Sequence, residues 1–261
     1  MTRLLIAFLA LALPAVAFAE SQGGSIEYKD RDTVLEGYLA VPKEAETSRP
    51  GVLVVPDWMG LKDFDRQVAD KLAGMGYVAL AVDMYGKGVR PADSSQAAAL
   101  AAKYKSDRKL MRERMHAALE TLRKVKSVDH KHIAAIGYCF GGTAVLELAR
   151  SGAPVAGVVS FHGGLETSTP QDAKNIKGKV LALHGADDPF VPPKEVAAFQ
   201  DEMRSGQVDW QMNIYGKAVH SFTNPAAGTD NSKGAAYNEN AAKRSWEAMK
   251  IFFNEIFGTQ Q

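Results

Sequence analysis

Short apolar segments alternate with segments of helical length along most of this chain, and this alternation limits the fold more than any other feature of the sequence. Each apolar segment is too short for a buried helix and is therefore predicted to be a strand. These strands are Gly51–Val55, Val78–Val82, Ile133–Ile136, Val155–Phe161, Val180–Leu183 and Val208–Ile214. Strands that alternate with helices predict an α/β fold, in which a mostly parallel central sheet is covered by helices on both faces.

The predicted helices occupy the intervals between these strands, at Phe64–Met75, Pro91–Val125, Gly141–Arg150, Pro193–Met203 and Ala235–Phe257. The second interval changes from alanine-rich to charged near Ser106 and Asp107, so we expect two helices that meet there. Two further strands, Ser25–Tyr28 and Leu35–Val41, precede the alternation and are predicted to form an antiparallel pair. In such sheets, reactive side chains gather at the carboxyl ends of the strands.

The N-terminus has the pattern of a secretory signal. A basic Arg3 precedes the apolar run Leu4–Val16, and Ala17-Phe18-Ala19 matches the small-x-small pattern of a cleavage site. The run is shorter than the roughly 20 residues that a bilayer-spanning helix needs. We therefore expect cleavage after Ala19, a periplasmic or secreted protein without stable membrane insertion, and a single α/β domain over residues 20–261. The alternative is an uncleaved N-terminal anchor.

Charge and cysteine content exclude several classes of partner. Once Arg3 is removed with the signal, basic and acidic residues balance at 30 each, and no basic run resembles a nucleic-acid footprint. Histidine and cysteine spacing matches no metal-binding motif, so we expect no metal and no cofactor. The chain has 1 cysteine, Cys139, and therefore no internal disulfide. In an exported protein a lone thiol indicates either burial in the core or catalysis.

The cysteine lies in a motif that is typical of a nucleophile. The segment Gly137-Tyr138-Cys139-Phe140-Gly141-Gly142 follows a predicted strand and precedes a predicted helix, which is the arrangement of a Gly-x-nucleophile-x-Gly elbow. The flanking glycines remove Cβ atoms that would clash in so sharp a turn. The helix N-terminus favours thiolate over thiol, and the Phe140 N–H points to where an oxyanion would form. The alternative is a structural cysteine beside a Gly-rich turn.

A thiol nucleophile needs a base, and later strand-end loops supply candidates. His220 follows one predicted strand, and Asp188 follows the strand before it in the chain. A carboxylate behind the imidazole would fix its tautomer and stabilise the imidazolium. Asp187 is the alternative acid, and we favour Asp188 because it immediately precedes Pro189 at the loop apex. A packing role is predicted for the two histidines that end buried strands, His162 and His184.

The motifs GYCFGG, ADDPFVP and HSF together resemble the dienelactone hydrolase family, a branch of the α/β-hydrolase fold with a Cys-His-Asp triad. The resemblance runs from Gly51 to the last helix and includes the segment VVPDWMG. It implies that Asp57 holds or activates Cys139. It also implies that the Trp58 N–H completes an oxyanion hole with the Phe140 N–H.

Three positions depart from the members that cleave dienelactone. Those members have glutamate where this chain has Asp57, and they use arginines to clamp the substrate carboxylate where this chain has Lys87 and Asn224. Lysine is a point charge and asparagine is neutral, so the bidentate clamp is lost. The reaction class is retained under this resemblance, but a dienelactone substrate does not follow. We expect Tyr85 and Lys87 to line the pocket and to favour anionic substrates.

These features predict an exported, monomeric hydrolase of a small-molecule ester, lactone or enol-lactone. Cys139, His220 and Asp188 would form the triad, and the acyl group would pass through a thioester. A thiol-redox protein and a ligand-binding pseudoenzyme on the same fold are the alternatives, although the redox reading lacks a second cysteine to resolve a mixed disulfide. The region from Gly88 to Lys105 is where a lid would lie.

Overall fold

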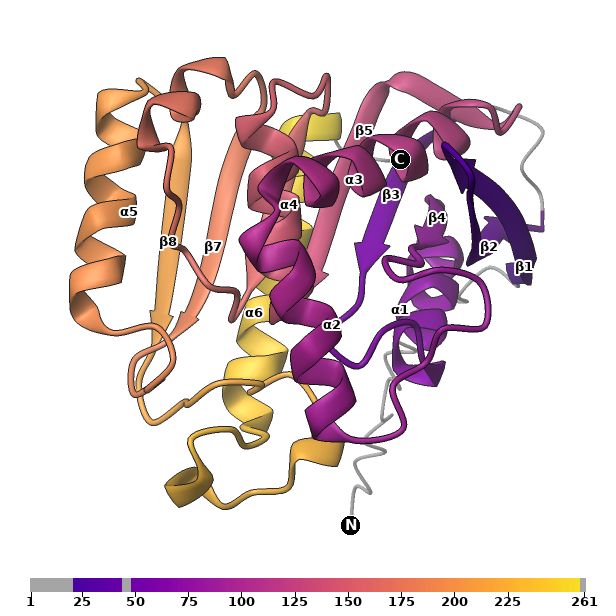
Figure 1. The fold of residues 1–261 in the computed structure, drawn as a ribbon. Coiled ribbons are helices and arrows are strands. Elements are labelled where there is room, and N and C mark those ends of the chain that lie inside the picture. The colour runs from indigo at the N-terminus through magenta and orange to yellow at the C-terminus, as the bar shows by residue number, and fades with distance from the viewer. Residues whose placement is uncertain (1–20, 44–47, 259–261) are drawn as a thin grey trace, which may run out of the picture.

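The described part of the chain in this computed structural model, residues 21–43 and 48–258, forms one eight-stranded sheet with helices on both faces (Figure 1). This arrangement confirms the predicted α/β fold with a mostly parallel sheet. The predicted signal and its cleavage site after Ala19 lie outside the described residues.

The strands run in the spatial order β1-β2-β4-β3-β5-β6-β7-β8. The first two pair antiparallel, as predicted, and β2 also runs antiparallel to β4, whereas every pair from β4 through β8 is parallel. Their bounds are β1 Ser21–Asp30, β2 Thr33–Pro42, β3 Arg49–Val55, β4 Val78–Ala81, β5 Val128–Tyr138, β6 Gly157–Phe161, β7 Lys179–Gly185 and β8 Trp210–Tyr215.

The helices are α1 Asp63–Gly74, α2 Ser94–Ser106, α3 Arg108–Arg123, α4 Phe140–Arg150, α5 Pro193–Ser205 and α6 Glu239–Phe257. Three short 3-10 helices are η1 Pro170–Asn175, η2 Pro225–Ala227 and η3 Asn231–Lys233. Asp107 separates α2 from α3 where the change in composition predicts it, and its carboxylate caps α3 by accepting from the Leu110 N–H. The last helix begins at Glu239 rather than Ala235, because Asn238 caps it by accepting from the Ala241 N–H.

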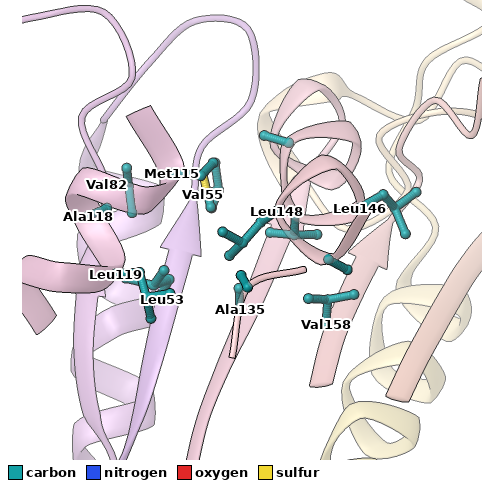
Figure 2. Close-up of a cluster of buried hydrophobic side chains, with 14 of the residues drawn as sticks. Leu53, Val55, Val82, Met115, Ala118, Leu119, Ala135, Leu146, Leu148 and Val158 are labelled. Carbon is teal, nitrogen blue, oxygen red and sulfur yellow. The ribbon is translucent and has the colours of Figure 1, made fainter. Parts of the chain in front are cut away.

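Alternate residues of the strands supply two cores, one on each face of the sheet, because successive side chains of a strand point to opposite faces. Leu53 and Val55 pack toward the face that α2, α3, α4 and α5 cover, and Val52 and Val54 pack toward α1 and α6. Figure 2 shows the first of these cores, where Leu53 and Val55 lie with side chains of α3 and α4. Burial on both faces explains why the strands are continuously apolar.

A buried ion network joins α4 to α5. The Arg150 side chain has no exposed surface and donates two hydrogen bonds of 2.8 Å to the Glu202 carboxylate. A third bond of 3.0 Å goes to Glu147, and a fourth of 2.9 Å goes to the carbonyl of Leu165. With so many partners, the guanidinium is satisfied despite its burial.

We expect Arg150→Ala to lower the free energy of unfolding by about 3–5 kcal/mol, because it leaves the buried Glu202 carboxylate without its cation and leaves Glu147 with Arg112 alone. The matched control is Arg204→Ala, which removes an exposed pair with Asp201 and should cost about 1 kcal/mol or less. Urea unfolding of both variants measures the difference. Equal losses would contradict a stabilising role for the buried network.

Candidate active site

Cys139 occupies the sharp turn between β5 and α4. Its backbone has φ 53° and ψ −114°, a strained conformation for a residue with a Cβ atom. A Cβ at Gly137 would lie 2.1 Å from the carbonyl oxygen of Gly141, and a Cβ at Gly141 would lie 2.2 Å from that of Val55. Glycine is therefore required at both positions, and the turn presents the half-buried thiol at the N-terminus of α4.

His220 and Asp188 lie together at the same edge of the sheet. His220 follows β8 and Asp188 follows β7, and the imidazole Nδ1 is 2.8 Å from Asp188 Oδ2. The carboxylate is buried, and its other oxygen accepts a 2.9 Å hydrogen bond from the Phe190 N–H. The ring of Phe190 covers His220 edge-on, with 5.3 Å between the ring centroids. Asp188 therefore fixes the tautomer and the orientation of the imidazole.

The protonation of His220 reflects both Asp188 and Cys139. Burial lowers its pKa, but hydrogen bonds with the Asp188 carboxylate and with Cys139, together with the negative charges of both groups, outweigh burial and raise the pKa to about 10. The imidazolium is thus favoured when it lies between a thiolate and a carboxylate. The structure brings the three side chains into one interacting group.

The neighbouring carboxylate, Asp187, takes no part in this group. Its side chain is exposed, and its backbone N–H donates to the Ala218 carbonyl. Asp188, one residue later, is turned inward beneath His220. The choice between the two acids is made by the loop after β7.

The turn after β3 places Asp57 and Trp58 beside the thiol. Asp57 Oδ1 accepts a 2.8 Å hydrogen bond from the Met59 N–H, and no hydrogen bond joins Asp57 to Cys139 in the described part of the chain. Burial raises the pKa of Asp57, whereas the Met59 N–H and the charges of Lys62 and His220 lower it. Because the charge of His220 acts on its pKa, Asp57 lies near the triad candidates, but it does not contact the sulfur through a hydrogen bond.

Tyr85 supports the same turn from the loop after β4. Its hydroxyl donates to the carbonyl oxygen of Trp58 over 2.8 Å, and its ring packs against Tyr104 of α2 and against Phe140. The predicted lid region therefore contains α2, whose Tyr104 is buried against these rings. Tyr85 holds the Trp58 peptide in place and is itself almost fully buried.

Lys87 does not join the other predicted site residues. Its ammonium pairs with Glu27, an exposed carboxylate of β1. The basic residue that lines the cavity beside Asp57 is Lys62, at the start of α1, and Asn224 lies in the same cavity. The sequence pattern could not show this, because the direction of the lysine stem depends on where β1 runs.

A cavity of about 450 Å³ opens beside these residues. Its lining includes Asp57, Lys62, Asp65, His162 and Asn224. A second cavity of about 410 Å³ adjoins it, and the two share the lining residues Phe64, Tyr138 and Thr223. The second cavity lies between α1 and α6 and adds Phe161, Tyr237 and Trp246 to its aromatic lining. Both cavities therefore combine polar and aromatic side chains, and their lining residues do not include Cys139 or His220.

His162 belongs to the site, although its position at the end of a buried strand predicts only packing. Its Nδ1 accepts a 3.2 Å hydrogen bond from the Cys139 N–H, and its Nε2 is 2.8 Å from Thr223 Oγ1. Burial and the charge of His220 hold the pKa of His162 well below its usual value. The signal that could have found it is a histidine directly at the carboxyl end of the strand adjacent to the elbow strand. His184, by contrast, is buried without a hydrogen-bond partner at Nδ1.

Neither a metal-ligand cluster nor a helix able to cross a bilayer is present in residues 21–43 and 48–258. In these ranges no three or more histidine, cysteine, aspartate and glutamate side chains gather where they could hold a metal. None of the helices there is both long and apolar enough to cross a bilayer.

Known proteins resemble this chain over most of its length. The model of the dienelactone hydrolase family matches residues 35–257. The solved structure m3DLH is 43% identical, with a TM-score of 0.88 over 92% of this chain and 100% of that one. The dienelactone hydrolase-like promiscuous phosphotriesterase P91 from metagenomic libraries is 41% identical, with a TM-score of 0.87 over 92% and 100% of the two chains. The probable 2-oxo-3-(5-oxofuran-2-ylidene)propanoate lactonase of Bradyrhizobium sp. is 29% identical over 226 residues, which are 82% of this chain and 87% of that one.

The raised pKa of His220 predicts a pH-dependent stability. A group whose pKa rises on folding stabilises the fold fully below its unfolded pKa, about 6.5 for histidine, and loses that contribution as the pH approaches its folded pKa of about 10. The free energy of unfolding of the wild type should therefore fall toward that of His220→Gln between about pH 7 and pH 10. Urea unfolding of both proteins across this range measures the difference, and a gap that widens with pH would contradict the assignment.

Proposed function

Because the chain belongs to the dienelactone hydrolase family and is therefore a hydrolase, we propose that it cleaves small esters, lactones or enol-lactones with Cys139 as the nucleophile. The observation that carries the proposal is the placement of His220 between Cys139 and the buried Asp188 carboxylate, with the 2.8 Å bond fixing the imidazole. A thiol at a strained strand-to-helix turn, a base and an orienting acid are the parts that nucleophilic acyl transfer requires.

In the first half of the reaction, the thiol proton resides on His220 and the thiolate attacks the carbonyl carbon. A carbon–sulfur bond forms as the carbonyl π-bond opens, giving a tetrahedral oxyanion. Its collapse breaks the carbon–oxygen bond of the ester, and His220 gives its proton to the departing alkoxide. The product is a thioester on Cys139, and with a lactone the freed hydroxyl stays attached to the acyl chain.

In the second half, His220 takes a proton from water, and the resulting hydroxide adds to the thioester carbonyl. Collapse expels the thiolate, and the carboxylic acid leaves. Asp188 stays ionised throughout and stabilises the imidazolium that forms in each half. The cysteine returns to its starting state, so one water is consumed for each ester bond.

Two backbone N–H groups are suited to the oxyanion. Neither the Phe140 N–H nor the Trp58 N–H donates to a protein acceptor in the described part of the chain. Asp57 holds the Met59 N–H and Tyr85 holds the Trp58 carbonyl, so both side chains fix the peptide units around Trp58. We assign Asp57 and Tyr85 to the support of this turn. Lys87, which is paired with Glu27, receives no role in substrate binding.

The cavities support a substrate that carries an apolar or aromatic group. The cavity lined by Asp57 and His162 combines charged and amide side chains with the rings of Phe64 and Tyr138, and its neighbour between α1 and α6 adds the rings of Phe161, Tyr237 and Trp246. Ligand sites commonly combine an apolar wall with a few fixed polar groups. An ester with an aryl substituent would fit these cavities.

We expect Cys139→Ala to abolish turnover of p-nitrophenyl acetate and of simple lactones, because it removes the sulfur on which the proposed acyl-enzyme forms. Asp188→Asn should lower kcat by roughly 10²-fold or more, since it removes the charge that stabilises the imidazolium. Asp187→Asn is the matched control and should retain wild-type rates. Full activity in Cys139→Ala would refute the nucleophile. A wild type that turns over no ester but forms mixed disulfides would favour the redox alternative.

The support of the Trp58 peptide is tested by Tyr85→Phe. The variant keeps the ring but loses the bond to the Trp58 carbonyl, so kcat for p-nitrophenyl acetate should fall by about tenfold with little change in KM. Tyr104→Phe, which alters a packed neighbour with no hydrogen bond from its hydroxyl in the described residues, is the control. An effect on KM alone would place Tyr85 in substrate binding instead.

A further inference from the structure

His162 occupies a strained and fully enclosed position directly after β6. Its φ is 41°, in the left-handed region that residues with a Cβ seldom adopt, and only 2% of its surface is exposed. Strain of this kind persists where the surrounding structure holds a side chain in place. The hydrogen-bond and ring contacts of the imidazole show which groups hold it in this position.

Both ring nitrogens of His162 have partners, and together they define its protonation. Nδ1 lies 3.2 Å from the Cys139 nitrogen and can only accept from that N–H, so it carries no proton. The proton must then be on Nε2, which donates to Thr223 Oγ1 over 2.8 Å. The ring is a neutral imidazole of one fixed tautomer. Burial and the charge of nearby His220 favour the same neutral form.

The two partners come from the two loops that must cooperate in catalysis. Cys139 is the elbow residue, and its N–H is shared with the Phe161 carbonyl at 3.0 Å. Thr223 lies in the loop after β8, three residues beyond His220. The His162 ring therefore links the backbone of the nucleophile to the loop that carries the base.

The same ring also restrains the base by direct packing. It meets the His220 ring at 5.2 Å between centroids with an interplanar angle of 65°, and it meets Phe222 at 5.1 Å and 81°. Edge-to-face contacts of this kind favour one orientation of each ring. The imidazole of His220 is thus bounded by His162 on one side and by Phe190 on another.

We infer that His162 is a positioning residue, which holds the Cys139 turn and the His220 loop in register by bonding to Cys139 through Nδ1 and to Thr223 through Nε2. The effect of His162 on catalysis rests on the proposed function. Its effect on the placement of the Cys139 thiol does not, and can be tested without any ester. His162 touches no reacting atom in this role. It affects the reaction rate only by holding the thiol and the His220 ring in position.

The test follows the alkylation of Cys139, the single cysteine, by iodoacetamide at neutral pH alongside the turnover of p-nitrophenyl acetate. Thr223→Val keeps the volume but removes the hydroxyl, and both rates should fall by about three- to tenfold, as expected for one lost hydrogen bond. Thr223→Ser restores the hydroxyl and should recover most of the loss. Urea unfolding of each variant shows whether the fold is retained.

A double-mutant cycle separates a linked pair from two independent sites. His162→Asn can still accept from the Cys139 N–H but is too short to reach Thr223. In this background Thr223→Val should therefore have no further effect on alkylation. Additive losses, or wild-type alkylation in Thr223→Val, would overturn the inference. If the wild type hydrolyses no ester but the alkylation cycle is coupled, the proposed function fails while the positioning role stands.

Discussion

The alignment of six parallel strands is the constraint on which the site depends. Because β3 to β8 run in the same direction, their carboxyl ends meet at one edge of the sheet. Asp57, Tyr85, Cys139, Asp188 and His220 each follow a different one of these strands, and His162 follows the remaining one. Residues separated by more than a hundred positions in sequence thus share one edge of the sheet, and buried rigid strands hold them there.

Backbone strain is present at this edge of the sheet. Cys139, His162 and Ser221 all have positive φ, and each lies in or next to the group formed by the thiol and the imidazoles. A strained backbone persists only where the surrounding structure holds it. Here the backbone packs closely against Gly137 and Gly141, and His162 accepts a hydrogen bond from the Cys139 N–H. Asp188 adds a second fixed point through its bonds to His220 and to the Phe190 N–H. The site is preorganised because these supports act on the same few residues.

The part of the site that depends on local motifs could be predicted from the sequence. The part that depends on contacts between distant segments could not. The elbow around Cys139 is specified within six residues, since its steric demand falls on the neighbouring glycines. Lys87 shows the opposite case, because its long stem is directed by Glu27 on a strand some sixty residues earlier. The role of His162 also needs two distant partners. The place of His162 at the carboxyl end of the strand next to the elbow strand makes it a candidate, but no feature within its own segment distinguishes packing from a bond to the nucleophile.

The sequence by itself determined the order and type of the strands and helices, the elbow, and the loops that carry the candidate acid and base. These follow from periodicity and turn sterics, which act between neighbours in the chain. The tertiary structure alone decided that Asp188 rather than Asp187 faces His220, that Asp57 binds the Met59 N–H, and that His162 bridges Cys139 and Thr223. Hydrogen bonds of this kind depend on ångström-level distances between separate strands, and no pattern within one segment specifies those distances.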